Sequence, residues 1–352
     1  GLETEGDKAT VTHTTADVIV VGGGAAGMQT ALELKARGIE PSIIERDIEL
    51  GGKVRGWHKL FPSFTPADDV LRPLVDRIKS ERIRCFLGQE VTSVALDGVM
   101  LRSGERVMAD AVVVATGFTL FDAHRKQEYG YGLYNNVITS VDLERMMKSG
   151  RVTLADGSEP RRIAILHCVG SRDEKVGQRH CSKVCCITGV KQAIELKEMY
   201  PEADVFNFYM DIRMFGPGYE ELYREAQERY NVHFVRGRIS EAAETINERI
   251  QIKAEDTLTG RPLRMTVDML VLLVGMSPNY ENRDIAASAN LPLSPNGYFK
   301  SKDSFLGAVM SEREGIFYAG AATAPKSLAD TLAEASLTAS AVDSYLKRRF
   351  ND

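Results

Sequence analysis

Short apolar runs alternate with longer segments of helical periodicity along this chain. Residues 17–21, 111–114 and 268–274 are strand-sized apolar runs, each followed within three residues by glycine. Residues 328–346 instead repeat apolar positions at the spacing of an amphipathic helix. Strands that alternate with helices in this way indicate a largely parallel sheet covered by helices. The pattern therefore predicts an α/β fold.

The first strand leads into a glycine motif. Gly22, Gly24 and Gly27 form the pattern G-x-G-x-x-G at the start of a predicted helix. Such glycines permit a tight turn, the close approach of the backbone to a pyrophosphate at the helix N-terminus, and close packing of the helix on the strand. The next strand, residues 42–44, ends in Glu45, and an acidic residue at this place accepts hydrogen bonds from a ribose hydroxyl. Together these features predict a dinucleotide site, and a glycine-rich turn without a ligand is the alternative.

Later features favour FAD over NAD as the occupant. A double glycine at residues 51–52 follows Glu45, and the strand at 111–114 is closed by Ala-Thr-Gly at 115–117. Near the C-terminus, residues 315–322 form another strand that ends in glycine, ahead of a long helix. This arrangement resembles the flavoprotein disulfide reductase superfamily and covers essentially the whole chain. One departure is Ala321 after Gly320, where that superfamily usually has Gly-Asp.

The resemblance implies a two-dinucleotide-binding-domain flavoprotein, in which a second Rossmann-like domain is inserted into a FAD-binding Rossmann domain. We expect a disordered lead-in at residues 1–15, the FAD domain at 16–117 and 279–352, and the inserted domain at 118–278. The predicted cofactor-binding residues are Gly22, Gly24, Ala26, Gly27, Glu45, Arg46, Gly52, Lys53, Val91, Ala115, Thr116, Gly117, Gly320, Ala321 and Lys326.

Four of the five cysteines lie close together, at the spacing C-x12-C-x3-C-C. They are Cys168, Cys181, Cys185 and Cys186. Thiols this close indicate a metal or iron–sulfur site before they indicate disulfides, in a chain without a secretory signature. An apolar strand precedes them and a helix at 188–200 follows, so we expect the cysteines in the turn that would carry the phosphate loop of a nucleotide-binding unit.

Three interpretations of these cysteines remain open. Zinc usually takes two separated CxxC pairs, and adjacent cysteines make tetrahedral closure awkward. A redox dithiol usually has a CxxC motif, which is absent here, and buried unreactive cysteines are the plain alternative. A 4Fe-4S cluster is the third interpretation, with charges nearby that would moderate a thiolate-ligated cluster. These are Arg172, Lys175, Arg179 and Lys183, while His167 and His180 are expected to pack beside the site and Cys85 to pack in a strand.

Composition and charge bear on the class of protein and on its cellular location. The 352 residues carry a formal net charge of −5, which argues against a general nucleic-acid binder. No apolar run approaches the length of a membrane span, and residues 1–15 are polar without the pattern of a signal peptide. A cytoplasmic protein is therefore expected.

Three longer motifs resemble one particular family. CVGSRDE with HCSKVCC at 168–186, DIRMFGPGYEELY at 211–223 and APKSLADTLAEAS at 324–336 are similar to the A subunit of heterodisulfide reductase, an FAD and iron–sulfur protein. The resemblance implies that the four cysteines hold a 4Fe-4S cluster beside the FAD. The large methanogen proteins carry further cysteines after the position of Pro62, together with ferredoxin-like insertions, and neither is present here. The chain looks like the short form in bacterial sulfur-oxidising heterodisulfide reductase-like complexes.

The expected function is that of an electron-transfer protein in which flavin and cluster act as a two-to-one electron gate within a larger complex. The resemblance implies B and C iron–sulfur subunits and a lipoate-binding protein as partners, and a homodimer is expected. Beyond the cofactors no catalytic set is evident, although Lys326 is expected to adjust the flavin potential. The alternatives are the A subunit of a quinone-interacting membrane-bound oxidoreductase and a self-sufficient FAD-dependent NAD(P)H oxidoreductase. The latter would need a second glycine motif, which the middle of the chain lacks.

Overall fold

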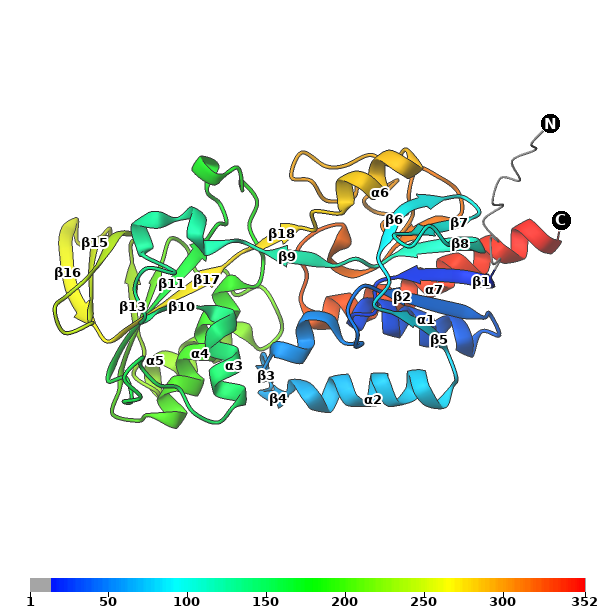
Figure 1. The fold of residues 1–352 in the computed structure, drawn as a ribbon. Helices are drawn as coiled ribbons and strands as arrows, with labels where there is room; N and C mark the ends of the chain where they lie inside the picture. Colours follow the sequence, from blue (N-terminus) through cyan, green and yellow to red (C-terminus); the bar gives the residue numbers. More distant parts are fainter. Residues whose placement is uncertain (1–13, 352) are drawn as a thin grey trace, which may run out of the picture.

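Two lobes, each built on its own β-sheet, make up the protein (Figure 1). The structure is a computed structural model, and it describes residues 14–351. The predicted lead-in lies outside the described residues, apart from Thr14 and Thr15, which begin β1. Among the described residues no helix is both long enough and apolar enough to cross a membrane.

The first lobe contains a seven-stranded sheet. Its parallel strands are β1 (Thr14–Val21), β2 (Pro41–Glu45), β5 (Arg84–Leu87), β8 (Arg106–Val114) and β19 (Ile316–Tyr318), and β6 (Val91–Ala95) and β7 (Gly98–Leu101) add an antiparallel edge. Because side chains alternate along a strand, Val18 and Val20 enter one core while Ile19 and Val21 enter the other.

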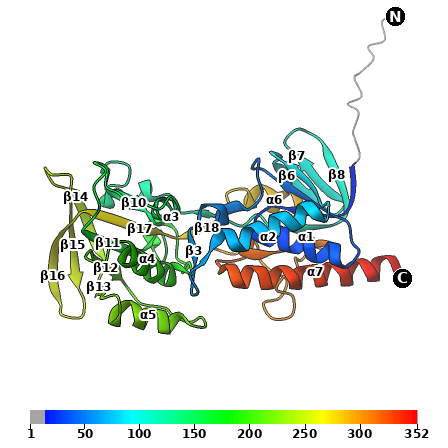
Figure 2. The ribbon, with the colours of Figure 1, turned by 90° about the horizontal axis from the view of Figure 1, so that it is seen from below.

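Helices cover both faces of this sheet. On one face lie α1 (Ala25–Ala36), α2 (Ala67–Ser80) and α7 (Leu328–Asn351), which Figure 2 shows side by side. The opposite face is covered by α6 (Asn282–Ala289). The first core is rich in alanine where α1 approaches α7, so the two helices pack closely.

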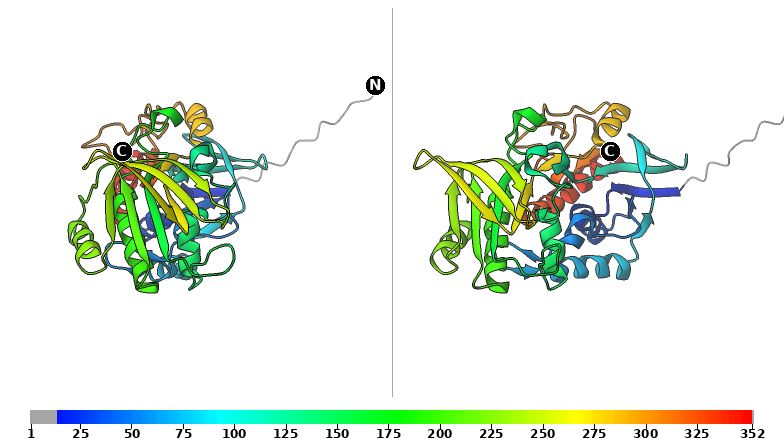
Figure 3. Two further views of the ribbon diagram at one scale, coloured as in Figure 1. Left: turned by 90° about the vertical axis from the view of Figure 1, so that its left-hand side faces the viewer. Right: turned by 60° about the vertical axis from the view of Figure 1, so that its left-hand side comes forward.

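The second lobe contains a five-stranded parallel sheet in the order β10-β17-β11-β12-β13. These strands are Val137–Thr139, Met269–Val274, Arg162–Val169, Asp204–Tyr209 and His233–Arg236. One face packs on α3 (Ser140–Lys148), α4 (Cys185–Met199) and α5 (Tyr219–Glu228). The other packs on an antiparallel sheet of β14 (Ile239–Glu244), β15 (Ile250–Asp256) and β16 (Arg261–Val267), yellow in Figure 3.

Two antiparallel strands join the lobes. The chain leaves the first sheet through β9 (Phe118–Leu120) and returns through β18 (Met276–Pro278), and these strands pair with each other. The predicted domain boundaries coincide with the start of β9 and the end of β18, and they stay a prediction. A small hairpin, β3 (Lys59–Leu60) with β4 (Thr65–Pro66), extends from the first lobe to the second. Short 3₁₀ helices lie at Gly52–Gly56, Ala123–Arg125, Gln127–Tyr129, Glu174–Val176 and Gly320–Ala322.

The architecture confirms the predicted α/β fold, with differences at the ends of elements. The helix expected from residue 188 begins at Cys185, so two of the cysteines lie in its first turn. The strand expected at 315–322 ends at Tyr318, because Gly320 takes a φ of 72° and the backbone turns into a 3₁₀ helix. The antiparallel sheet β14–β16 was not predicted, although residues 250–254 of β15 alternate between buried and partly exposed positions.

Candidate cofactor and cysteine sites

A cavity of about 550 Å³ opens at the carboxyl ends of β1, β2 and β8. Of the fifteen predicted cofactor-binding residues, thirteen line it, and Gly27 and Gly320 do not. Ligands of open α/β sheets bind at this end of the strands. The cavity is therefore the place where the predicted dinucleotide would lie.

The glycine motif shapes one wall of this cavity. Gly22 has a φ of 112°, and a Cβ on it would lie 2.3 Å from the Ala115 carbonyl oxygen. A Cβ on Gly27 would lie 1.8 Å from the Gly22 carbonyl oxygen, so Gly27 serves the packing of α1 against β1 and does not face the cavity. A Cβ on Gly24, in contrast, would meet no atom within 4 Å. The backbone at the N-terminus of α1 thus faces open space, as a phosphate cradle requires.

Glu45 is fixed beside this cradle. Its Oε2 accepts a hydrogen bond from the Gly23 N–H at 2.6 Å, and its Oε1 accepts one from the Asp47 N–H at 2.8 Å. A carboxylate offers about four acceptor positions, so two remain for ribose hydroxyls. These two free acceptor positions fit the dinucleotide predicted from the sequence.

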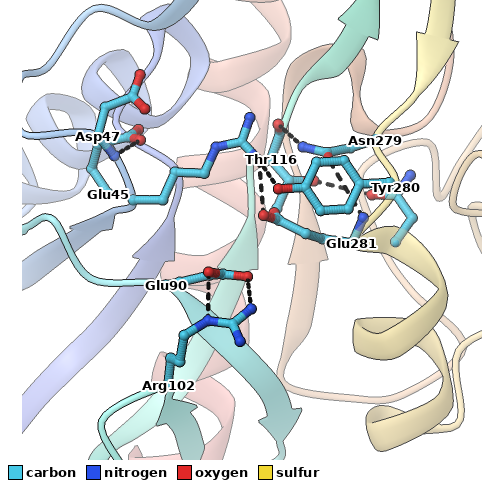
Figure 4. A network of polar contacts seen from close by, with 10 residues as sticks. Glu45, Asp47, Glu90, Arg102, Thr116, Asn279, Tyr280 and Glu281 are labelled. Atoms are coloured by element: carbon cyan, nitrogen blue, oxygen red, sulfur yellow. Dashed lines mark hydrogen bonds and ion pairs between the residues drawn. The ribbon is translucent and has the colours of Figure 1, made fainter.

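Side chains from distant segments of the chain meet in a network of polar contacts (Figure 4), several of whose members line the cavity. Arg46 Nη1 lies 2.8 Å from Glu281 Oε1 and donates to the Tyr280 hydroxyl at 3.1 Å. Asn279 Nδ2 donates to the Thr116 carbonyl oxygen at 3.1 Å. Asn279 and Glu281 line the cavity, but sequence reasoning missed them. The only sequence signal was their position directly after the return strand β18.

Lys326 lies near the N-terminus of α7 and lines the same cavity. Its Nζ donates to the Gly320 carbonyl oxygen at 2.8 Å and to Thr323 Oγ1 at 2.6 Å, and it lies 3.2 Å from Glu334 Oε2. Burial lowers the pKa of Lys326, and the Glu334 carboxylate opposes that shift. The lysine is therefore held in place by its own turn rather than extended into solvent.

The four clustered cysteines occupy the strand end and helix start of one βα unit. Cys168 lies near the end of β11, Cys181 in the connection, and Cys185 and Cys186 in the first turn of α4. Three residues of this segment have positive φ although they are not glycine, namely Cys168 at 60°, Arg172 at 52° and Lys183 at 62°. Non-glycine residues take this conformation rarely, and such strain is concentrated at functional sites.

The thiols act on one another electrostatically. Interaction with the Cys185 thiol lowers the pKa of Cys168, which the guanidinium groups of Arg172, Arg238 and Arg213 lower further. The same contact and burial hold the pKa of Cys185 well above its usual range. Burial, with the nearby Cys168 and Cys181 thiols, raises the pKa of Cys186 to about 11. The four cysteines thus lie within electrostatic range of one another.

Backbone contacts surround this group. The Lys183 N–H donates to Cys181 Sγ at 3.3 Å, and Cys186 Sγ donates to the Asp211 carbonyl oxygen at 3.4 Å. Hydrogen bonds from N–H groups to sulfur are one of the features that tune iron–sulfur clusters. Within residues 14–351 no three His, Cys, Asp or Glu side chains converge as they would on one metal ion.

The predicted charges around the cysteines are only partly in place. Arg172 acts on Cys168 and pairs with Asp211 at 2.7 Å. Lys183 instead pairs with Asp330 at 2.8 Å, and Arg179 points into solvent beside Glu174. Arg213 and Arg238, which act on Cys168, were missed because they lie far along the chain.

The remaining residues near the cysteines have other partners. His167 Nε2 lies 2.7 Å from Asn207 Oδ1, and burial lowers the pKa of this imidazole to about 4. His180 Nε2 lies 2.8 Å from the Met276 carbonyl oxygen. Cys85 is on β5, where it packs against the first core.

The turn after β11 differs from the cavity-lining glycine loop after β1. Gly170 directly follows β11, and a Cβ on it would lie 1.9 Å from the Phe121 ring. The helix α4 does not begin until Cys185, and the segment between them carries cysteines instead of the pattern G-x-G-x-x-G. A dinucleotide bound in the ordinary mode would lack its anion cradle here.

The comparisons with known proteins give the class of this protein. A family model described as pyridine nucleotide-disulphide oxidoreductase matches residues 16–339. The chain belongs to this family of oxidoreductases. The thioredoxin reductase of T. acidophilum shares the fold, with a TM-score of 0.67 and 17% identity over 94% of this chain and 98% of that one.

Curated relatives narrow the similarity within the family. The chain is 32% identical to the iron-sulfur A subunit of the CoB–CoM heterodisulfide reductase of Methanocaldococcus jannaschii, over 92% of this chain and 63% of the relative. It is 41% identical to the A subunit of the H(2)/formate:CoB-CoM heterodisulfide,ferredoxin reductase of Methanococcus maripaludis, over 67% of this chain and 37% of the relative. The resemblance to the A subunit of heterodisulfide reductase is confirmed, although the chain spans less than two thirds of these relatives.

Proposed function

We propose that this protein is the FAD- and 4Fe-4S-containing electron-transfer subunit of a heterodisulfide reductase-like complex. The observation that carries the proposal is that four thiols lie between the end of β11 and the first turn of α4, in place of a phosphate loop. The name of the relative from Methanocaldococcus jannaschii, an iron-sulfur subunit, supports the same assignment. Family membership and the cavity beside Gly24 support FAD as the second cofactor.

Two separate sets of residues would bind the two cofactors. Gly22, Gly24 and Glu45 would hold the pyrophosphate and ribose of FAD, and Cys168, Cys181, Cys185 and Cys186 would hold the cluster. When bound, FAD exchanges electrons in pairs and the cluster exchanges them singly, which is the basis of a two-to-one electron gate. Burial of three of the four cysteines would keep water from the cluster. Arg172, Arg213 and Arg238 would offset part of its negative charge.

The proposal extends to the complex in which this protein acts and to its partner subunits. A cytoplasmic sulfur-oxidising complex is favoured because the chain has no cysteine beyond the four clustered ones and Cys85. In that setting the partners would be B and C iron–sulfur subunits and a lipoate-binding protein, and the chain would form a homodimer. The A subunit of a quinone-interacting membrane-bound oxidoreductase is the alternative. A self-sufficient NAD(P)H oxidoreductase is less well supported, because the connection between β11 and α4 carries the cysteines and no G-x-G-x-x-G motif.

Anaerobic purification followed by absorption and electron paramagnetic resonance spectra tests the proposal. Flavin bands and a 4Fe-4S signal that changes on reduction with dithionite are expected. Stoichiometric zinc, or flavin without any metal after strictly anaerobic handling, would overturn the cluster assignment. Rapid reduction of the isolated protein by NADH would instead favour the self-sufficient enzyme.

Lys326→Ala is expected to lower the flavin potential. A buried cation near the N-terminus of α7 favours the anionic reduced flavin, and its removal takes that support away. A change on the order of 30 mV corresponds to about 1.4 kcal/mol for a two-electron couple. Glu334→Gln is the matched control, because it removes the carboxylate that faces Lys326 and should shift the potential upward. Equilibrium redox titration of both variants measures the shifts, and an unchanged potential in Lys326→Ala would contradict the role of this lysine.

A further inference from the structure

Lys183 lies between Cys181 and the first turn of α4, and its backbone is left-handed. Its φ is 62°, a conformation that residues with a side chain take rarely, because the Cβ crowds the following carbonyl group. With this backbone its N–H donates to Cys181 Sγ at 3.3 Å. Glycine would take the same conformation without strain, yet the sequence has a lysine here. We therefore expect the lysine side chain to have a function of its own.

The Lys183 side chain reaches the first lobe. Its Nζ donates to Asp330 Oδ2 at 2.8 Å, and Asp330 lies 147 residues later, in the first turn of α7. The hydrogen bond from Lys183 lowers the pKa of the Asp330 carboxyl, so the pair is charged at neutral pH. The Asp330 N–H in turn donates to Ser327 Oγ at 3.1 Å, just before α7 begins. The ion pair thus joins the cysteine segment to a fixed point of the first lobe.

The neighbouring residue, Ser182, is anchored to the second lobe instead. Ser182 is 0% exposed, and its Oγ accepts the Met276 N–H at 2.8 Å and pairs with Ser171 Oγ. Met276 begins the return strand β18. The side chains of Lys183 and Asp330 are, in contrast, 40% and 49% exposed. The ion pair can therefore be removed without disturbing the buried contacts of the segment.

Lys183 also lies close to the cavity proposed for FAD. Burial lowers the pKa of Lys326, and the nearby Lys183 ammonium lowers it further. Lys326 lines the FAD cavity. A single side chain thus lies near both proposed cofactor sites, although it belongs to the cysteine segment.

We propose that Lys183 is a positioning residue for the cluster. Its ion pair with Asp330 holds the left-handed backbone in which the Lys183 N–H bonds to Cys181 Sγ, and this hydrogen bond raises the reduction potential of the cluster. Hydrogen bonds to the sulfur ligands help to set the potentials of iron–sulfur clusters, because they stabilise the more negative, reduced state. Asp330, a residue of the first lobe, would then adjust a cluster held by the second. The inference rests on the cluster assignment in the proposed function.

Equilibrium redox titration of the protein with both cofactors bound compares Lys183→Gly with Lys183→Ala. Both variants lose the same charge, but only glycine takes a φ near 62° without strain, so only Lys183→Gly should keep the hydrogen bond. We expect the cluster potential to be lower in Lys183→Ala than in Lys183→Gly. The expected difference is about tenfold in the reduction equilibrium, or about 59 mV for a one-electron couple.

Lys175→Gly and Lys175→Ala are the matched controls for this titration. Lys175 is an exposed lysine of the same connection between β11 and α4, but its φ is not positive. Exchanging glycine for alanine there changes no hydrogen bond to a cysteine. The cluster potentials of these two variants should therefore agree.

Amide hydrogen exchange at residue 183 is a second measurement, and it needs no cluster. After correction for the intrinsic rate of each residue, the amide should be protected in the parental protein and in Lys183→Gly. It should exchange about tenfold faster in Lys183→Ala and in Asp330→Asn, the equivalent of one lost hydrogen bond. Asp330→Asn is informative because it nearly keeps the shape of the side chain and removes only the charge that holds Lys183.

Equal cluster potentials in Lys183→Gly and Lys183→Ala would overturn the proposal, and so would an exchange rate that Asp330→Asn leaves unchanged. A parental protein that holds no 4Fe-4S cluster after anaerobic purification would contradict the proposed function, and with it the effect on the potential. The exchange rates would still decide whether Asp330 fixes the backbone of Lys183. A cluster that is present, with potentials that do not distinguish the two Lys183 variants, would leave the proposed function standing.

Discussion

Cys185→Ala is expected to lose the iron–sulfur cluster, from about four irons per chain to fewer than one. Cys185 lies in the first turn of α4, where burial and the neighbouring thiols hold its pKa well above the usual range. A metal binds such a thiol only after the thiol has lost its proton. The metal–sulfur bonds offset the cost of burying the thiolates, and they do so only when all four ligands bind. Three thiols would remain, and the fifth cysteine, Cys85, is on β5 in the first lobe.

Cys85→Ala is the matched control for this experiment. It removes one half-buried thiol from the same chain, and burial raises the pKa of that thiol as well. Iron content and the reduced-state resonance signal should stay at the parental level. The flavin absorbance should persist in both variants, because no cysteine of the described residues lines the FAD cavity. A Cys185→Ala protein that keeps its full iron content and signal would mean that Cys185 is not a ligand.

The flavin side of the molecule could be predicted because its chemistry is local. The glycines after β1, Glu45 at the end of β2 and the residues after β8 are each tied to a strand end, and parallel strands bring their carboxyl ends to one edge. Thirteen predicted residues therefore line one cavity. Gly27 was counted among the cofactor-binding residues, but it does not line the cavity: a Cβ on it would lie 1.8 Å from the Gly22 carbonyl oxygen, so it allows the close helix–strand packing that the motif also predicts.

Contacts between segments far apart in the chain could not be predicted from the sequence. Asn279 and Glu281 line the cavity, but in the sequence they follow the whole inserted lobe and stand 162 or more residues after Gly117. Arg213 and Arg238 reach Cys168 from the connections that follow β12 and β13, and no spacing rule joins them to a cysteine motif. Such partners depend on how strands order themselves in the sheet, which short-range patterns do not determine.

A buried ionic network between the lobes was also unforeseen. The hairpin region contributes the His58 N–H, which donates to Glu144 Oε2 at 2.9 Å, and the His58 ring, whose Nδ1 lies 2.9 Å from Glu195 Oε1. Lys191 lies between the two carboxylates and also bonds the Lys59 carbonyl oxygen. Because α3, α4 and the hairpin converge on one lysine, the network fixes the first lobe against the second.

Lys191→Met is accordingly expected to destabilise the protein by about 3–5 kcal/mol, the cost of removing one partner from a buried ion pair. Lys191 is 2% exposed, and methionine would fill most of its volume while removing the cation that Glu144 and Glu195 share. Urea unfolding of the FAD-loaded protein, followed by circular dichroism, measures the free energy of unfolding. The loss should shrink as the pH falls from about 7.5 to about 5.5, because protonation removes the uncompensated charges. Burial already raises the pKa of Glu195, so the folded state binds that proton more tightly than the unfolded chain does.

Lys148→Met tests whether the loss of stability in Lys191→Met comes from the buried charge or from the lost contact between the lobes. Lys148 also joins the two lobes, through Asp68 Oδ1 at 2.7 Å and the Arg55 carbonyl oxygen at 2.9 Å, but both side chains of this pair are about a third or more exposed to water. Its loss should cost about 1 kcal/mol or less and vary little with pH over the same range. Equal losses in the two variants would mean that the contact between the lobes, rather than the buried charge, governs stability. A small, pH-independent loss in Lys191→Met would show that the buried network contributes little to the folded state.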